Sequence, residues 1–483
     1  MFHWSILYLI VERGGILRAA SWLSVNKKSE PKSGVCRRDD FFGERRTAIF
    51  ARRIRMSKYE PLELAEKTQI GGRDVDLARL PTGYEVKVDL GIAAAAKLNG
   101  SVVYRTDSGT LFETRAIKTS SGEYLLMFPT NTIESAEGRS HYGGASEKRN
   151  DLVAFRSEDR GGSWNGPTRP IDIDYNLHGF VPFVPERTEV NPGKRIYCFG
   201  TQPIWGLHSR EHGLHENAPI GYRYSDDDGS HWSEVRLIRP TNDPGFTGMS
   251  VMRMDETHKG TWLIGAHEGD WSYSPLMTRQ YILRSEDQGM TWELLPGPRH
   301  GGWHAAVYNR MDEGRPISLA DGRVLLMART PEGHLWQAWS EDDGKSWSDP
   351  TPSSLVHPDA PPMVFHLSDG ETLAAFHHNR SHDRDYSGLS SAKEEIMKDR
   401  SEIWVSLSRN GGEDWGEPRF VFSTAVAPRY EKPFFNYQCS YMDMFLDGKT
   451  VNLFVPHLWH QVLHLQIEEG DLIDLSDEAT ILD

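Results

Sequence analysis

The sequence predicts an all-β fold assembled from repeated four-stranded units, which is the organisation of a β-propeller. A short pattern, S-x-[DN]-x-G-x-x-W, occurs five times, each copy follows a β-type run, and 68, 60, 55 and 68 residues separate the successive serines. Self-similarity of this kind identifies a repeat architecture, and the spacing leaves room for about four short strands with their loops, one propeller blade. The five copies occupy residues 157–164, 225–232, 285–292, 340–347 and 408–415.

Each copy has the chemistry of a tight hairpin turn. Ser and Asp side chains bond neighbouring backbone N–H groups, Gly supplies a position of positive φ, and Trp begins the next strand as a packing anchor. An acidic turn can also suggest calcium, but an EF-hand loop needs a bidentate Glu at its twelfth position and flanking helices, and neither is present. We therefore interpret the five copies as structural.

A short run rich in aromatic and branched residues precedes each copy, and turn signals bound it. Such runs predict strands. The five predicted strands are 152–155, 221–224, 280–283, 335–339 and 403–407.

Composition narrows the classes of function. Hydrophobic residues make up 38% of the 483 residues, and no long apolar span exists, which argues against a transmembrane bundle. The net charge of −15 argues against a nucleic-acid partner. Three cysteines (Cys36, Cys198 and Cys439) do not make a disulfide framework, so we expect a cytoplasmic protein.

The chain divides into four segments. Residues 1–56 carry twelve Lys and Arg against five Asp and Glu and are expected to be a basic, non-globular extension; their apolar start does not match a signal peptide. Residues 57–108 are expected to lead into the ring and help to close it, through a strand at 101–105. Residues 109–475 are the predicted propeller, and 476–483 are an acidic tail.

The repeated pattern is the Asp box, and the set of five resembles the sialidase superfamily of six-bladed β-propellers. The most specific local resemblance is Glu313 followed sixteen residues later by Arg329, around an Asp-Gly turn. Adjacent antiparallel strands would place both residues at one edge of a sheet. In the family, such a Glu and Arg belong to the active site.

Two more arginines resemble the family's carboxylate-binding set. Arg115 leads a predicted inner strand, although Arg-Ala-Ile stands where the family has Arg-Ile-Pro. Arg400 opens the strand that runs into the last Asp box, with Arg380 and Arg384 as alternatives. Three converging guanidinium groups can grip a carboxylate, and sialic acids carry one on the anomeric carbon.

The resemblance further implies a neutral Tyr nucleophile, which Glu313 would deprotonate. A gapless match to the family pattern places Cys439 at the position of the nucleophile. Strand alternation would give Tyr437 and Tyr441 the same face as Cys439, so a small gap in the match places either tyrosine there. Tyr441 is the preferred candidate.

The family also uses a separate carboxylic acid, in the loop between the first two outer strands. No Asp stands clearly in the family's place, which leaves Glu137 and His141 as candidates for this acid/base role, with a structural role favoured for Asp151. His-x-x-x-His spacing at 208/212, 300/304 and 460/464 lies in expected loops and strands without the Glu of a zinc helix, so no metal and no cofactor are expected.

The predicted function is thus a sialidase-like hydrolase acting on an acidic carbohydrate or glycoconjugate. Two alternatives stay open. Some uronate lyases also use propellers with His, Tyr and Arg, and a non-catalytic propeller would keep the arginine contacts and bind carbohydrate without turnover. The sequence makes no prediction of the oligomeric state.

Overall fold

The computed structural model describes most of the propeller and, towards the N-terminus, five short strands. The described residues are 9–11, 17–19, 67–70, 73–76, 84–86, 101–105, 109–132, 151–172, 178–185, 195–203, 217–270, 272–273, 276–306, 308–379, 400, 402–423, 426–428, 439–457 and 461–475.

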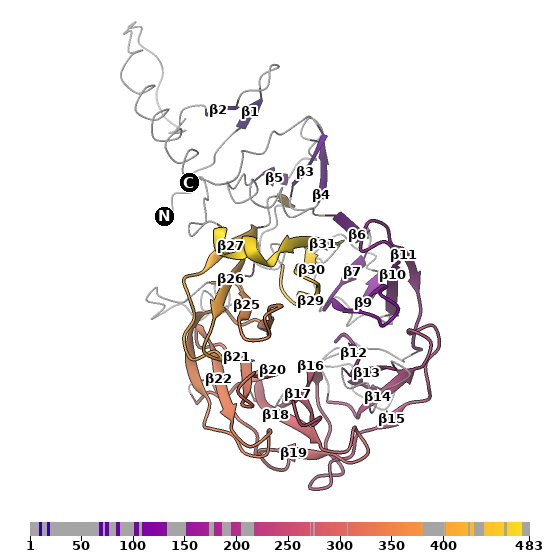
Figure 1. Cartoon of the computed structure of the whole chain (residues 1–483), viewed down its shortest axis with the longest axis vertical. Coiled ribbons are helices and arrows are strands. Elements are labelled where there is room, and N and C mark those ends of the chain that lie inside the picture. The colour runs from indigo at the N-terminus through magenta and orange to yellow at the C-terminus, as the bar shows by residue number, and fades with distance from the viewer. Residues whose placement is uncertain are drawn as a thin grey trace, which may run out of the picture.

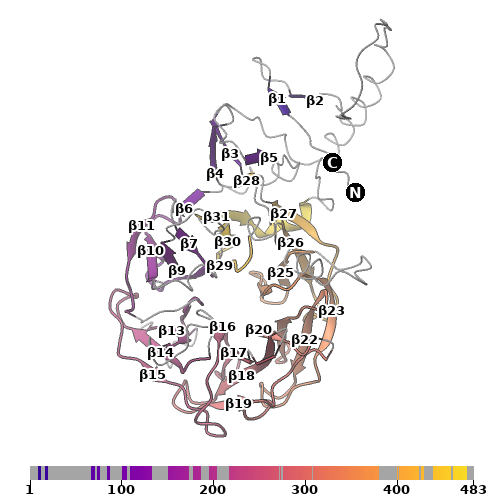
Figure 2. The same cartoon turned by 180° about the vertical axis from the view of Figure 1, so that it is seen from behind.

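Six antiparallel blades are arranged in a ring, as Figures 1 and 2 show from its two sides. The predicted all-β, six-bladed propeller is therefore confirmed. The innermost strands of the blades, in order, are β8 (Arg115–Lys118), β12 (Val181–Phe183), β16 (Ser250–Glu256), β20 (Asp312–Ser318), β24 (Met363–His366) and β29 (Asp443–Asp447). The second strands are β9 (Tyr124–Thr132), β13 (Ile196–Thr201), β17 (Trp262–Asp270), β21 (Val324–Arg329), β25 (Leu373–His377) and β30 (Thr450–His457).

The third strands contain all five runs predicted from the sequence. They are β10 (Asp151–Ser157), β14 (Ile220–Ser225), β18 (Met277–Ser285), β22 (His334–Ser340), β26 (Glu402–Ser408) and, in the sixth blade, β31 (Gln461–Glu468). The outer strands are β11 (Asn165–Thr168), β15 (Arg236–Leu237), β19 (Glu293–Leu295), β23 (Thr351–Val356), β27 (Arg419–Ser423) and β6 (Ser101–Arg105).

The Asp boxes join the third strand of a blade to its outer strand. In the third blade, Ser285 Oγ accepts a hydrogen bond from Gly289 N at 2.8 Å, and Gly289 has a φ of 84°. Trp292 Nε1 donates to the Gly289 carbonyl at 3.1 Å. The sixth blade has no such box because its third and outer strands are not consecutive in the chain.

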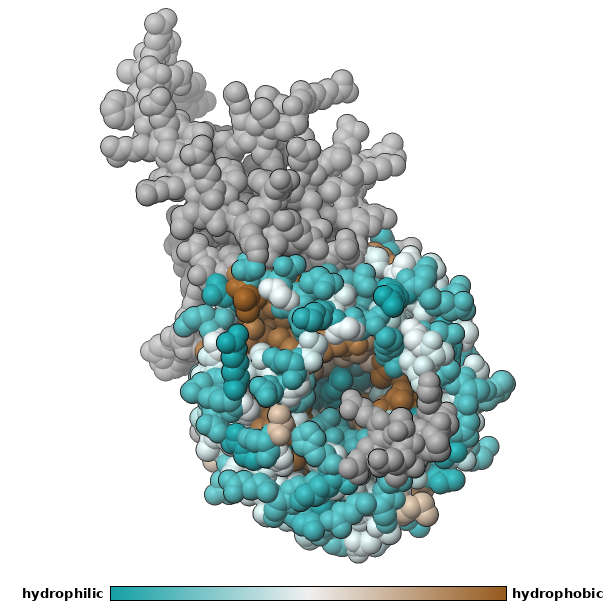
Figure 3. Space-filling model, viewed as in Figure 1, coloured by the Kyte–Doolittle hydropathy of each residue, from teal (hydrophilic) through white to brown (hydrophobic). Residues whose placement is uncertain are grey.

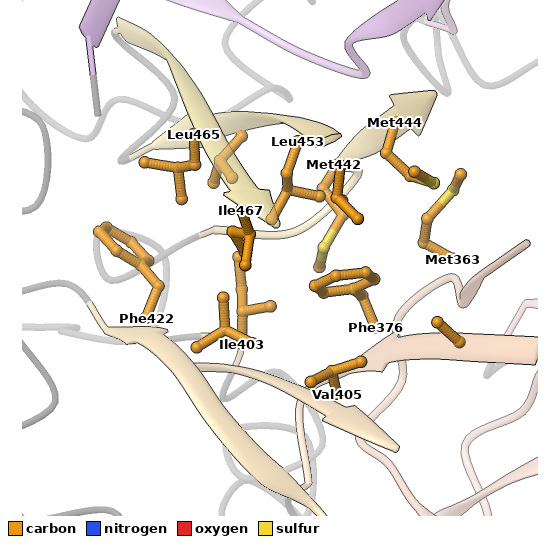
Figure 4. Packing of buried hydrophobic residues seen from close by; sticks show 14 of the residues in the cluster. Met363, Phe376, Ile403, Val405, Phe422, Met442, Met444, Leu453, Leu465 and Ile467 are labelled. Carbon is orange, nitrogen blue, oxygen red and sulfur yellow. The ribbon is translucent and has the colours of Figure 1, made fainter. Parts of the chain in front are cut away.

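The outer strand of the sixth blade comes from the beginning of the propeller. β31 pairs with β6 in antiparallel register, so a strand from before the first blade joins the last one and closes the ring. Figure 1 shows yellow β31 next to indigo β6. Beside this closure, the largest hydrophobic cluster fills the space between blades five and six, where Phe376 and Ile403 face Met442 and Leu453 (Figure 4).

A few shorter elements complete the described structure. β7 (Gly109–Leu111) pairs with β9. The remaining pairs are β1 (Leu9–Val11) with β2 (Leu17–Ala19), β3 (Lys67–Ile70) with β4 (Arg73–Asp76), and β28 (Val426–Pro428) with β5 (Tyr84–Val86). A 3-10 turn, η5, spans Glu469–Asp474, and no helix in the described part of the chain has the length and apolar character to cross a membrane.

The antiparallel order of the strands decides which residues meet at each end of the ring. Each innermost strand begins, and each second strand ends, at the end of the ring opposite to the Asp boxes. Side chains at these positions come from all blades and surround the central axis. Figure 3 shows a hollow at the centre of the ring, with hydrophilic residues on its floor and hydrophobic residues along part of its rim.

Candidate active site

Tyr441, Glu313 and Arg329 meet in a hydrogen-bonded triangle at the axis. The Tyr441 hydroxyl donates to Glu313 Oε1 at 2.9 Å. Arg329 Nη1 lies 2.6 Å from Glu313 Oε2 and 3.0 Å from the Tyr441 hydroxyl oxygen. All three side chains are buried, with relative exposures of 8%, 2% and 7%, respectively. A phenol, a carboxylate and a guanidinium are thus held together out of bulk water.

The fourth blade brings Glu313 and Arg329 together. Asp312 pairs with Arg329 across β20 and β21, as expected for the ends of adjacent antiparallel strands. The register shifts between Asp312 and Arg315, and Glu313 within this irregularity has a φ of 51°. Positive φ is uncommon for residues other than glycine, and such strain concentrates at functional sites.

The first blade positions Tyr441 of the sixth. Thr114 Oγ1 lies 3.2 Å from the Tyr441 carbonyl oxygen, and the backbone N–H of Ala116 donates to Asp443 Oδ2 at 2.9 Å. Tyr441 itself has a φ of 61°. The backbone before β29 is therefore held against β8 in a conformation that directs the phenol to Glu313.

Asp359 connects the arginines of blades four and five. It follows β23 and accepts from Arg329 Nε at 2.6 Å, and Arg310 Nη1 lies 3.3 Å away. Arg400 Nη2 donates to the carbonyl oxygen of Asp359, and the Arg400 guanidinium lies 5.6 Å from the centre of the Tyr441 ring. Arg329 and Arg400 therefore both border the phenol.

Arg115 belongs to a second buried ion pair. Its Nη2 donates to Glu113 Oε2 at 3.0 Å, and Glu113 Oε2 also accepts from Gly179 N at 2.8 Å. His178 Nδ1 lies 2.6 Å from Glu113 Oε1. Glu113 has a φ of 35°, a third non-glycine residue of positive φ at this end of the ring.

The surroundings prepare Glu313 as a base and keep Tyr441 neutral. Burial raises the pKa of the Glu313 carboxyl, but Arg329 and His267 outweigh it, so its pKa lies below its ordinary value. Burial and the charge of Glu313 raise the pKa of the Tyr441 phenol above its ordinary value. An ionised carboxylate thus accepts a hydrogen bond from a protonated phenol.

Glu113 and His178 form an ion pair because neighbouring charges outweigh the effect of burial on their pKa values as well. Burial raises the pKa of Glu113, but His178 and Arg115 lower it to about 2. Burial lowers the pKa of His178, but Glu113 outweighs it, and the pKa of His178 lies above its ordinary value. The negative charge of Glu113 is therefore matched by two cationic neighbours.

Two of the site arginines keep unused hydrogen-bond donors. Within the described part of the propeller, the Nε–H groups of Arg115 and Arg400 are buried and have no acceptor. A buried donor without a partner is costly, and an anion entering the site would supply one. The site therefore has both the charge and the free donors for a carboxylate.

The same residues include the candidate ligands for a metal ion. Oxygen or nitrogen atoms of Glu113, His178 and Glu313 lie within 4.8 Å of one another. Arg115 and Arg329 already hold the two carboxylates, at 3.0 and 2.6 Å, respectively, and would repel a cation. This arrangement favours an anion.

Several of the sequence-selected residues lie outside the described residues and remain predictions. They are Glu137, His141, Arg380, Arg384 and Tyr437. Asp151 begins β10 and pairs with exposed Arg169 at 2.6 Å, on the surface of the first blade.

One expectation about the region before β29 is wrong. Cys439 and Tyr441 precede the strand, and the positive φ of Tyr441 breaks the alternation that would have given them one face. Cys439 instead joins the hydrophobic cluster between blades five and six, and its N–H donates to the Arg400 carbonyl at 2.9 Å. The gapless match to Cys439 therefore does not identify the residue beside Glu313.

Four residues of the site were missed from the sequence: the buried Glu113, His178 and Asp359, and the partly buried Arg310. Each lies in a connection just before an innermost strand, where no periodic pattern or turn signature marks it. The one feature that they share, a position directly before an inner strand, could have identified them as candidates.

Comparisons with known proteins agree with the fold. A family model described as BNR repeat-like domain matches residues 192–453. A xyloglucanase from Paenibacillus sp is 29% identical over 170 residues, which cover 32% of this chain and 15% of that protein. The matched segment is thus a small part of that relative.

Solved structures with the same fold include sialidases. The NanB sialidase from Streptococcus pneumoniae has a TM-score of 0.52 at 10% identity, over 78% of this chain and 71% of that one. A leech intramolecular trans-sialidase has a TM-score of 0.50 at 14% identity, over 77% and 70%. A protein of unknown function from Dyadobacter fermentans has a TM-score of 0.53 at 15% identity, over 80% and 100%.

Proposed function

The chain belongs to the BNR repeat-like domain family, and from that premise and the geometry of its site we propose that it is a glycoside hydrolase of sialidase type. Its substrate would be a terminal α-linked sialic acid or a related carboxylated sugar. The observation that carries the proposal is the 2.9 Å hydrogen bond from the Tyr441 hydroxyl to Glu313, with Arg329 touching both residues.

Tyr441 is the nucleophile in this proposal. Its oxygen attacks the anomeric carbon while Glu313 takes the phenolic proton, and the bond from that carbon to the leaving oxygen breaks. A carboxylate nucleophile would meet the charge of the substrate's own carboxylate beside the reacting carbon. A phenol that is neutral until the moment of attack avoids this repulsion, which suits the raised pKa of Tyr441.

The arginines hold the carboxylate of the sugar. Arg400 and Arg115 offer buried Nε–H donors, and Arg329 lies against the nucleophile itself. Guanidinium groups are suited to this role because their planar fork matches a carboxylate and stays charged. Binding the carboxylate here places the anomeric carbon, to which it is attached, next to the Tyr441 oxygen.

A further group must protonate the leaving oxygen and then activate water to release the sugar from Tyr441. Glu137 and His141 remain the proposed candidates, on the connection between β9 and β10. Water then adds to the anomeric carbon, the bond to Tyr441 breaks, and the phenol recovers its proton from Glu313.

Hydrolysis of a fluorogenic sialoside tests the proposal. We expect turnover by the wild-type protein and a loss of about 10²-fold or more in Glu313→Gln and Arg329→Ala. Arg323→Ala is the matched control, because Arg323 lies in the turn at the far end of the same two strands, where it pairs with Asp321 at 2.7 Å. The control should retain activity.

The alternatives have distinct readouts in the same experiment. A folded wild-type protein that does not cleave the sialoside, but produces a near-ultraviolet-absorbing unsaturated uronate from polyuronates, would be a lyase. Saturable binding of sialosides without any turnover would identify a carbohydrate-binding propeller. Either result contradicts the proposed hydrolase.

A further inference from the structure

Arg315 is a buried cation on the propeller axis that the proposed chemistry does not use. It lies within the innermost strand β20 of the fourth blade and is 2% exposed. Its Nη1 contacts the sulfur of Met363 on β24, in the next blade. This thioether is its only hydrogen-bonding contact within the described part of the chain, and its buried Nε–H has no acceptor there.

The neighbouring arginines on the axis differ from Arg315 because each has a carboxylate. Arg115 lies 3.0 Å from Glu113, and Arg253 lies 3.0 Å from Asp443. No ion pair joins Arg315 to an Asp or Glu of the described residues. Among the described residues, Arg315 is therefore a buried guanidinium that no carboxylate holds in an ion pair.

The charge of Arg315 is also poorly stabilised by its surroundings. Burial and the nearby Arg115 lower the pKa of its guanidinium to about 9, while Asp443 opposes this effect only in part. A guanidinium nevertheless keeps its proton near neutral pH. An unpaired buried charge is among the most unfavourable features that a folded protein can carry, so a missing counter-charge is indicated.

We propose that a small inorganic anion, chloride, binds on the propeller axis against Arg315. The site is distinct from the proposed carboxylate site because Arg315 lies within its strand, beyond the bulge that holds Glu313 at the mouth of the ring. The proposal does not depend on any catalytic activity of the protein.

The walls of this site suit a halide. Met252 lies on the neighbouring inner strand β16, and its sulfur is 3.8 Å from Nη2 of Arg115. Together with Met363, two polarisable thioethers border the guanidinium groups. Bound chloride would accept the unused hydrogen bond of the Arg315 Nε–H and balance the charge of this guanidinium.

Thermal unfolding in chloride-free buffer tests the site without any substrate. Sodium gluconate is replaced stepwise by sodium chloride at constant ionic strength. A ligand that binds only the folded state raises the Tm with its concentration, and we expect a saturable rise of about 3 °C. A Tm that does not change with chloride would overturn the proposal.

Arg315→Met removes the charge with little change in the length of the side chain. This variant should have a higher Tm than the wild type in gluconate and no response to chloride. Arg299→Met is the matched control on the surface, where Arg299 pairs with Asp243, and it should respond as the wild type does. A full chloride response in Arg315→Met would contradict the assignment.

A crystal of the wild-type protein grown in bromide gives a direct answer even if Arg315→Met does not fold. Anomalous scattering should place one bromide within hydrogen-bonding distance of the Arg315 guanidinium. Bromide bound elsewhere only would overturn the proposal, as would a crystal soaked with sialic acid in which the carboxylate of the sugar replaces bromide on Arg315. Because no assay here requires turnover, failure of the hydrolase proposal would leave these results interpretable.

Discussion

Tyr441 and Glu313 are joined by a 2.9 Å hydrogen bond although 128 residues separate them in the chain, and both have a positive φ. The two residues lie just before or at the start of the innermost strands of blades six and four. An unfavourable backbone conformation at both partners is retained only if the surrounding structure enforces it. The fold therefore enforces the geometry of this pair.

Removing the phenolic oxygen should stop the chemistry and leave the fold intact. For Tyr441→Phe we expect kcat to fall by about 10²-fold or more, because Glu313 then has no proton to accept from a nucleophile. Binding of free sialic acid, measured by calorimetry, should change little since the arginines remain. Unchanged kcat in this variant would exclude Tyr441 as the nucleophile.

The buried ion network around Arg329 should be important for stability as well as for activity. Arg329→Met leaves Glu313 and Asp359 buried with one cation fewer, and breaking such a pair costs about 3–5 kcal/mol of the free energy of unfolding. Urea denaturation measures this loss. Adding Glu313→Gln should recover part of it, because one unpaired charge is removed; a purely additive double variant would show that the two residues are not coupled.

The Asp boxes should contribute to stability and not to activity. Ser285→Ala removes the acceptor of the buried Gly289 N–H and a hydrogen bond to Asp287, and we expect the free energy of unfolding to fall by about 1–2 kcal/mol. Met290→Ala, at the exposed tip of the same turn, is the control and should be neutral. A selective loss of kcat/KM in Ser285→Ala would contradict a structural role.

Acid should destabilise the closure between the sixth and first blades through His464. This side chain is 1% exposed, stacks on Phe454 at 4.6 Å, and burial lowers its pKa from 6.5 to about 4. Because the unfolded chain binds the proton more tightly, stability is complete above about pH 6.5 and is lost as the pH falls towards 4, by up to about 3 kcal/mol.

Urea denaturation of His464→Gln at several pH values measures this contribution. Its stability should fall less steeply than that of the wild type between pH 6.5 and 4. His231→Gln is the control, since this side chain is 90% exposed. Equal slopes in the wild type and His464→Gln would show that His464 does not cause the acid sensitivity.

The fold could be predicted because its signal is local and repeated. Each Asp box predicts a turn because its own side chains supply the hydrogen bonds of that turn. The residue types before each box predict a strand, and all five predicted runs lie in the third strands of blades. The proximity of Glu313 and Arg329 could be predicted for a similar reason, because one hairpin, β20 and β21, brings the two residues together.

The rest of the site could not be predicted because it is built across blades. Glu113, His178 and Asp359 come from connections of different lengths that meet only when the ring closes. The positive φ of Tyr441 gives its side chain a different direction from that of Cys439, and the type of a residue does not predict such a φ. That no carboxylate of the described residues forms an ion pair with Arg315 also becomes visible only when the contacts across the blades are known.

The most direct measurement is mass spectrometry of the protein quenched in acid during turnover of a fluorogenic sialoside. If Tyr441 is the nucleophile, a fraction of the wild-type protein carries the mass of one sialosyl group, and peptide mapping places it on Tyr441, while Tyr441→Phe carries none. Turnover without any adduct on Tyr441, or an adduct on another residue, would contradict the proposed mechanism.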